Sequence, residues 1–154
     1  MNRILLIAAT IGLAGAAPSP TPPQTPAGPD FLVKNGAAKG VVTTPSGLEY
    51  FIVKSGSQSG PHPTAQDTVT FDYEVTLLTG QLIDSSYATG QPLTGPAGAF
   101  VPGFTEALEL MRPGDEWIVW VPPQLGYGPN DKGPIPGNSV LRFKLALHSV
   151  TPAR

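Results

Sequence analysis

One amphipathic segment, residues 103–111, constrains the fold more than any other part of the sequence. Phe104, Leu108 and Met111 recur there at helical spacing, and a Pro-Gly pair at 113–114 ends the pattern. The segments around it alternate like strands. Because one short helix cannot bury enough apolar surface alone and a one-sided sheet needs a cover, each must bury the other. The sequence therefore predicts an α+β fold in which a curved antiparallel β-sheet is wrapped around one short α-helix.

Residues 67–78 carry the clearest strand pattern, with apolar and polar side chains in alternation. Further strands are expected at 48–54, for which an edge position is one reading, and at 81–84, 115–121 and 139–150. Residues 115–121 are apolar on both faces, as in a central strand that is covered on both sides. The predicted sheet therefore has its centre near the strand that follows the helix.

The remaining segments of the folded part are expected to be mostly irregular. Residues 94–99 are few and lack strand character, and residues 125–137 form a long Gly/Pro loop. Tyr127 and Ile135 stand out in that loop, because loops hide few large apolar side chains. A short turn of helix is expected over residues 31–35.

The composition excludes several classes of function. The chain has no cysteine, so disulfides, thiolate metal sites and a cysteine nucleophile are ruled out. Nine Lys and Arg against eleven Asp and Glu form no basic run, so no nucleic-acid partner is expected. Neither histidine has a serine and a carboxylate near it in the pattern, and no Gly-rich phosphate loop or cluster of metal ligands occurs. The sequence predicts neither a cofactor nor a metal.

The first residues are typical of an export signal. Arg3 precedes an apolar run at residues 4–13, which ends in small residues at 14–17. We expect residues 1–16 to be cleaved and the mature protein to be periplasmic or secreted, with no membrane contact after cleavage. The alternative is an uncleaved anchor, but the run is shorter than the roughly twenty apolar residues that span a bilayer.

Three segments follow the predicted signal. Residues 17–30 are a Pro-rich spacer of the polyproline II type, for which a role as a ligand of a partner domain is the alternative. Residues 31–47 are expected to be a lead-in segment. Residues 48–151 are expected to form the folded domain.

Large apolar side chains recur near the ends of the predicted elements. They are Tyr73, Ile83, Leu93, Phe100, Val101, Phe104, Tyr127, Ile135 and Phe143. With one carboxylate, Asp84, they can line an apolar pocket beside the start of the helix. The alternative is an ordinary core for the inward-facing residues and turn capping for Asp84. Tyr127 and Ile135 fit that alternative least, because they lie in a Gly/Pro loop.

Several short motifs fall in one register along residues 67–150. Among them are Ile83-Asp84-Ser85-Ser86-Tyr87, Val101-Pro102-Gly103-Phe104, Met111-Arg112-Pro113-Gly114, Leu125-Gly126-Tyr127-Gly128, Ile135-Pro136 and Leu141-Arg142-Phe143. In this order and spacing the chain resembles the FKBP-type peptidyl-prolyl cis-trans isomerases. Upstream, residues 40–50 are similar to the lead-in of the secreted bacterial subgroup, the relatives of the macrophage infectivity potentiator.

The resemblance implies a half-barrel sheet on one helix and an isomerase domain at residues 48–151. It places Phe104 at the floor of a proline pocket, a position where many relatives have Trp, and Asp84 at the rim. The implied walls and closing loop are formed by Tyr73, Phe100, Val101, Phe143, Tyr127 and Ile135. The Tyr127 hydroxyl and the Val101 backbone N–H would hold the substrate backbone or a ligand carbonyl. The implied partners are proline-containing polypeptides and macrolide inhibitors of the FKBP type.

Two positions depart from the family pattern. Ile83 stands where Phe is common, and Leu93 where Phe or another large apolar residue is common, so a wider and less aromatic pocket is expected. A chaperone or ligand-binding module with weak or no turnover is therefore the alternative function. The chain has no room for the long helical dimerisation domain of some relatives, so we expect a monomer.

Overall fold

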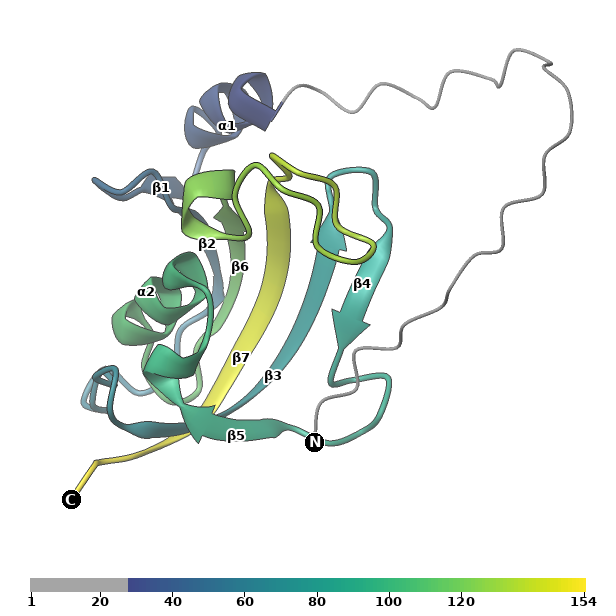
Figure 1. The fold of residues 1–154 in the computed structure, drawn as a ribbon. Coiled ribbons are helices and arrows are strands. Elements are labelled where there is room, and N and C mark those ends of the chain that lie inside the picture. Colours follow the sequence, from purple (N-terminus) through teal and green to yellow (C-terminus); the bar gives the residue numbers. More distant parts are fainter. Residues whose placement is uncertain (1–27) are drawn as a thin grey trace, which may run out of the picture.

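The computed structural model describes residues 28–154 of the chain (Figure 1). The predicted signal segment and residues 17–27 of the predicted spacer lie outside the described residues. The helices are α1 (Gly28–Gly36) and α2 (Pro102–Leu110), with short 3₁₀ turns at η1 (Ala97–Ala99) and η2 (Pro123–Leu125). The strands are β1 (Val41–Thr43), β2 (Glu49–Lys54), β3 (Thr68–Leu77), β4 (Leu82–Ser85), β5 (Leu93–Pro96), β6 (Glu116–Val121) and β7 (Leu141–Thr151). Neither helix of residues 28–154 is long and apolar enough to cross a membrane.

The strands form one antiparallel sheet in the order β1-β2-β6-β7-β3-β4, and β5 also pairs with β3. The sheet curves around α2 and stays open, with the helix on its concave side (Figure 1). This architecture confirms the predicted α+β fold with a curved antiparallel sheet and a covering helix. The sheet centre is also as predicted, because β6 lies between β2 and β7.

The pairing of β3 explains how the sheet bends around the helix. On one side β3 follows β7 from Thr68↔Thr151 to Leu77↔Leu141, with a register shift after Thr70. On its other side β3 is shared, since β5 pairs with its first half and β4 with its second half. One strand edge thus carries two short strands, and the concave surface opens between them.

The helix α2 fills the concave side of the sheet with one apolar stripe. Phe104, Ala107 and Leu108 are buried, and Met111, which follows the helix, is buried as well. Gly103 is required by the packing, because a Cβ atom there would lie 2.6 Å from Val121 Cγ1. The helix ends where the Met111 N–H donates to the carbonyl oxygens of Ala107 and Leu108.

Two strand predictions need correction. The segment 94–99 was expected to lack a strand, but residues 93–96 form β5, whose pairing with β3 rests on the backbone and on a hydroxyl contact rather than on an apolar face. The edge reading of β2 is also wrong, because β1 covers one side of it and β6 the other. The short strands β1 and β5 lack the alternation that sequence patterns detect.

The helix α1 packs on the face of the sheet opposite α2. It contains the predicted helical turn at 31–35 and begins three residues earlier. The Phe31 ring lies 6.5 Å from the Trp120 ring between centroids, and Asn35 Nδ2 donates to Glu49 Oε2 at 2.7 Å. Burial raises the pKa of Glu49, and the hydrogen bond from Asn35 opposes that shift. The lead-in segment is thereby held against β2 and β6.

Candidate functional site

A cavity of about 800 Å³ opens between the concave face of the sheet, the start of α2 and the loop at 126–137. All ten residues singled out by the sequence lie on its walls: Tyr73, Ile83, Asp84, Leu93, Phe100, Val101, Phe104, Tyr127, Ile135 and Phe143. They come from β3, β4, β5, the segment before α2, α2 itself, the loop and β7. The structure thus brings together residues that are up to 70 positions apart in the chain.

Phe104 lies at the bottom of the cavity with only 4% of its surface exposed. Its ring centroid is 5.0 Å from those of Phe100 and Phe143, 5.2 Å from that of Phe71 and 6.5 Å from that of Tyr73. The rings of Tyr73 and Phe143 meet Phe104 edge to face, a geometry that aromatic quadrupoles favour. Because α2 lies on the concave face of the sheet, the cavity has an aromatic floor with fixed ring orientations.

One polar pair lies on the wall of this apolar cavity. The Tyr73 hydroxyl donates a hydrogen bond to Asp84 Oδ2 at 2.6 Å, and Asp84 Oδ1 accepts from the Ser85 N–H at 2.8 Å. Burial raises the pKa of Tyr73, and the hydrogen bond and the negative charge of Asp84 raise it further. The hydroxyl is therefore neutral at physiological pH and keeps the Asp84 carboxylate at the rim.

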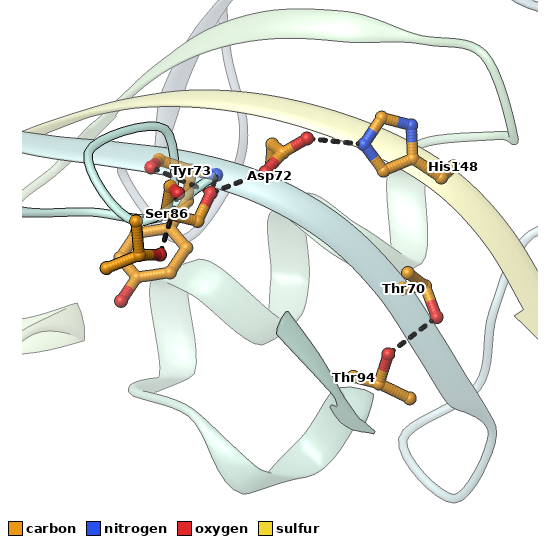
Figure 2. Close-up of polar contacts among 7 residues, drawn as sticks. Thr70, Asp72, Tyr73, Ser86, Thr94 and His148 are labelled. Atoms are coloured by element: carbon orange, nitrogen blue, oxygen red, sulfur yellow. Dashed lines mark hydrogen bonds and ion pairs between the residues drawn. The ribbon is translucent and has the colours of Figure 1, made fainter. Parts of the chain in front are cut away.

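A polar network on the other face of β3 holds the backbone of Tyr73 (Figure 2). The Tyr73 N–H donates to Ser86 Oγ at 2.9 Å, and Ser86 Oγ donates to Asp72 Oδ1 at 2.6 Å. His148 Nε2 lies 2.7 Å from Asp72 Oδ2, which joins β7 to the network. Tyr73 is thus fixed twice, through its backbone by Ser86 and through its hydroxyl by Asp84.

The same face also fixes the strand that carries Leu93. The hydroxyl groups of Thr70 on β3 and Thr94 on β5 lie 2.9 Å apart (Figure 2). Leu93 follows in the β5 register opposite Phe71 and is 39% exposed. Ile83 lies on β4 and is half-buried. These two aliphatic residues occupy the side of the cavity on which β4 and β5 diverge.

The loop at 126–137 covers part of the cavity and contributes five residues to its wall, from Tyr127 to Ile135. Its tip is a tight turn in which Lys132 and Ile135 exchange backbone hydrogen bonds of 2.8 and 3.0 Å. Ile135 is 6% exposed and points into the apolar interior, whereas Tyr127 is 43% exposed. Further along, the Asn138 N–H donates to the Gly128 carbonyl at 2.9 Å and closes the loop on itself. The large apolar side chains of this loop therefore have a place in the cavity wall.

Six lining residues were not singled out by the sequence. They are Phe71, Val75, Ala99, Lys132, Gly133 and Pro134. Phe71 and Val75 could have been found, because they share the inward face of their strand with Tyr73 at a spacing of two. The other four lie in a 3₁₀ turn and a loop tip, where no periodic signal exists.

The cavity walls are mostly apolar, so they can bind a ligand by shape and exclude water, but they carry no obvious reactive group. Within residues 28–154 no group of three or more His, Asp or Glu side chains is arranged to hold a metal ion. An apolar ring can enter between the aromatic side chains, while a polar chain attached to it stays at the rim near Asp84, Tyr127 and Lys132. The open half-barrel and this cavity together define a class of proteins that bind a small apolar ring at the start of their central helix.

Comparison with known proteins identifies the family. The profile of the FKBP-type peptidyl-prolyl cis-trans isomerases matches residues 60–148, more than half of the chain. The chain belongs to this family, and the resemblance found in the sequence is confirmed.

Curated relatives and solved structures agree with this membership. The chain is 44% identical over 127 residues to the outer membrane protein MIP of Legionella longbeachae, across 82% of this chain and 54% of the relative. It is 37% identical over 126 residues to the FKBP-type isomerase FkpA of Escherichia coli K12, across 82% and 46%. The crystal structure of FkpA from Escherichia coli superposes with a TM-score of 0.77 at 38% identity, across 82% of this chain and 59% of that one. The chain spans about half the length of the curated relatives it matches.

Proposed function

We propose that this chain is a peptidyl-prolyl cis-trans isomerase that acts on proline-containing polypeptides. The observation that carries the proposal is the aromatic-floored cavity at the start of α2, in a chain of the FKBP-type family. The proline ring enters this cavity, and the peptide continues along the rim in both directions.

The mechanism follows from the nature of the barrier. Resonance opposes rotation about a peptide C–N bond by about 18–20 kcal/mol, and an uncatalysed prolyl bond takes about 10–100 s to isomerise. In the twisted state the resonance is lost and the carbonyl oxygen carries less negative charge. A dry, apolar cavity favours this less polar amide over the planar one, and each ~1.4 kcal/mol of that preference raises the rate about tenfold. No nucleophile is needed.

Each lining residue has a role in this scheme. Phe104 supports the proline ring from below, and the rings of Tyr73, Phe100 and Phe143 set the width of the cavity around it. Ile135 excludes water from above. These roles follow from the burial of Phe104 and Ile135 and from the ring distances around Phe104.

The polar groups orient the peptide. The Tyr127 hydroxyl and the Val101 N–H hold backbone carbonyl groups of the substrate, and Asp84 lies beside the prolyl amide. Asp84 also fixes the Tyr73 ring through its hydrogen bond. Ile83 and Leu93 form the aliphatic side of the site and leave room for varied residues next to proline.

The proposed setting is outside the cytoplasm. Residues 1–16 act as a cleaved export signal, residues 17–30 as a Pro-rich spacer, and the isomerase domain at 48–151 assists the folding of exported proteins as a monomer. The name of one relative, outer membrane protein MIP, supports an exported location. Size-exclusion chromatography with light scattering tests the monomer, and mass spectrometry of protein recovered from the periplasm or medium tests the cleavage after residue 16.

A proline-limited refolding assay tests the activity. Wild type should accelerate the slow refolding phase, and Phe104→Ala or Tyr73→Ala should abolish or sharply reduce the acceleration. Phe51→Ala is the matched control, because it removes the same ring from β2, outside the cavity. Unchanged acceleration in both cavity variants would refute the assigned site.

The alternative, a chaperone or ligand-binding module with little turnover, retains one argument in the aliphatic Ile83 and Leu93. A macrolide inhibitor of the FKBP type separates the two functions. Turnover that the macrolide inhibits rules out the alternative as the sole function. Suppressed aggregation of an unfolded client without turnover on any prolyl peptide would favour it.

A further inference from the structure

The first described residue of α1 lies against the loop that covers the cavity. A Cβ atom on Gly28 would be 3.0 Å from Val140 Cγ2 and 3.8 Å from the Asn138 carbonyl oxygen. The Asn138 N–H in turn donates to the Gly128 carbonyl at 2.9 Å, and Gly128 follows Tyr127 of the cavity wall. In Figure 1 the start of α1 lies above this loop. The chain that precedes Gly28 therefore joins the domain next to residues 138–140, where the loop that covers the cavity leads into β7.

The segment that leads to this point is rich in the chemistry that the cavity fits. Residues 17–27 read Ala-Pro-Ser-Pro-Thr-Pro-Pro-Gln-Thr-Pro-Ala. Five of these eleven residues are proline, and none is charged. Each proline forms a bond of the type on which the proposed activity acts, and no desolvated charge opposes entry into an apolar site.

The segment is long enough to reach the cavity. An extended chain spans at most about 3.3–3.6 Å per residue, so Pro23 can lie about 17 Å and Pro18 about 34 Å from Gly28. Between Gly28 and Tyr127 lie Asn138, whose carbonyl oxygen would be 3.8 Å from a Cβ atom on Gly28, and Gly128, whose carbonyl accepts the Asn138 N–H. Several prolines of residues 18–23 therefore have the reach to enter from the loop side.

We propose that residues 17–27 bind in the cavity of their own chain as an intramolecular prolyl ligand. This inference rests on the proposed function, because it gives that site a built-in competitor. A short covalent tether places a ligand at an effective concentration on the order of millimolar, which matches the weak affinity expected of a single prolyl bond in an open site. The segment therefore limits access for weakly bound peptides, and tightly bound clients displace it.

A competitor of this kind leaves a defined kinetic signature. It lowers the fraction of open sites, so KM for a short prolyl peptide is raised about two- to tenfold while kcat is unchanged. The effect does not depend on protein concentration, because segment and site belong to one molecule. Its own prolyl bonds also exchange between cis and trans faster than in the free peptide.

The test uses the exported form, residues 17–154, and a variant in which Pro18, Pro20, Pro22, Pro23 and Pro26 are replaced by alanine. A matched control replaces Ser19, Thr21, Gln24 and Thr25 by alanine and keeps every proline. The proline-free variant should show KM lowered about two- to tenfold at constant kcat, and the control should behave like wild type. Equal KM in all three proteins would overturn the proposal and leave the isomerase function intact.

Methyl NMR gives a readout that does not require turnover. The δ1-methyl signals of Ile135 and Ile83 in the cavity should differ between wild type and the proline-free variant, while that of Ile118, which is absent from the cavity wall, should not. Absent shifts at both cavity methyl groups contradict the inference. Shifts or KM differences that grow with protein concentration also contradict it, because they place the segment in a second molecule. Absent turnover with these shifts present would instead count against the proposed function alone.

Discussion

The two faces of β3 carry side chains of opposite polarity. Toward the helix, Phe71, Tyr73 and Val75 line the cavity with aromatic and aliphatic surface. Away from the helix, Thr70 and Asp72 bind neighbouring segments through hydroxyl and carboxylate hydrogen bonds (Figure 2). One face offers an empty apolar volume, and the other offers satisfied polar contacts.

The difference shows how a half-open sheet can keep a rigid cavity. A cavity has no atoms of its own to hold its walls apart, so the walls must be fixed from outside. The Ser86 and Asp72 contacts fix the Tyr73 backbone, and the Thr70–Thr94 contact fixes β5 near Leu93. Residues of the concave face should therefore affect activity by contacting the substrate. Residues of the convex face should affect it by holding the cavity walls in place.

The largest expected effect comes from the floor of the cavity. Phe104→Ala should lower the free energy of unfolding by about 3–5 kcal/mol, because a buried ring is removed and its space is refilled only in part. Chemical denaturation measures this loss, and the same protein should be nearly inactive on a prolyl peptide. Phe51→Ala, at a ring that is 38% exposed, is the control and should cost much less. Equal losses in both variants would contradict the buried role of Phe104.

The next effect comes from the convex face. Asp72→Ala removes the closer acceptor of the Ser86 hydroxyl, which keeps only the Tyr73 carbonyl oxygen at 3.4 Å, and removes the partner of His148, so a loss of about 1–3 kcal/mol is expected. Glu74→Ala, two residues away on the same face, is the matched control. If the convex face acts through position, Asp72→Ala should also lower kcat/KM severalfold, although Asp72 is absent from the cavity wall. Full activity with reduced stability would limit the network to a structural role.

The same carboxylate gives an acid dependence of stability. The hydrogen bond from Ser86 lowers the pKa of Asp72, partial burial opposes this shift, and His148 lowers the pKa further. The folded state therefore binds the proton less readily than the unfolded chain. The stabilisation is present above about pH 4, the usual carboxyl range, and is lost as the pH falls through the lower folded-state value. Urea titrations at pH 2–6 should show that the free energy of unfolding depends less steeply on pH in Asp72→Ala than in wild type.

A smaller effect is expected for the Tyr73 hydroxyl, which joins β3 to Asp84 on β4. Tyr73→Phe removes the hydrogen bond to Asp84, and a loss of about 0.5–1.5 kcal/mol should follow at neutral pH. Because the pKa of Tyr73 is raised in the folded state, its stabilisation is complete below about pH 10 and is lost as the pH rises through the folded-state value. The variant should therefore lose less stability than wild type between pH 10 and 12. Tyr87→Phe, outside the cavity wall, is the control for the loss at neutral pH only, because burial also raises the pKa of Tyr87.

The smallest effect is expected at β5. Thr94→Val keeps the shape of the side chain and removes the hydroxyl contact with Thr70, for a loss of about 0.2–1 kcal/mol. Activity should change little, because Leu93 is also placed by the backbone pairing of β5 with β3. A large loss of activity would show that the Thr70–Thr94 hydroxyl pair, and not the backbone pairing of β5 with β3, positions Leu93.

The concave face was predictable from the sequence, whereas most of the convex face was not. Alternation with a period of two placed Tyr73 and Phe143 on inward faces, and helical spacing placed Phe104 on the stripe that meets them. All ten candidate residues lie on one cavity, although β5, which carries Leu93, was not predicted.

The polar network was missed because its partners are distant in the chain. Asp72 and His148 are 76 residues apart, and no local pattern joins them. The strands β1 and β5 were missed for a related reason, since these strands of three and four residues are held by backbone pairing and show no periodic pattern. Long-range polar contacts and short edge strands depend on the assembled sheet, which the local sequence does not encode.

The most direct test of the central claim is exchange NMR on a short Xaa-Pro peptide with a catalytic amount of the protein. The account predicts that cis and trans signals exchange faster than in the free peptide, that one equivalent of an FKBP-type macrolide per protein abolishes the effect, and that Phe104→Ala lacks it while Phe51→Ala retains it. Exchange at the uncatalysed rate, or acceleration that survives in Phe104→Ala, would contradict the claim that an apolar cavity on α2 lowers the rotation barrier.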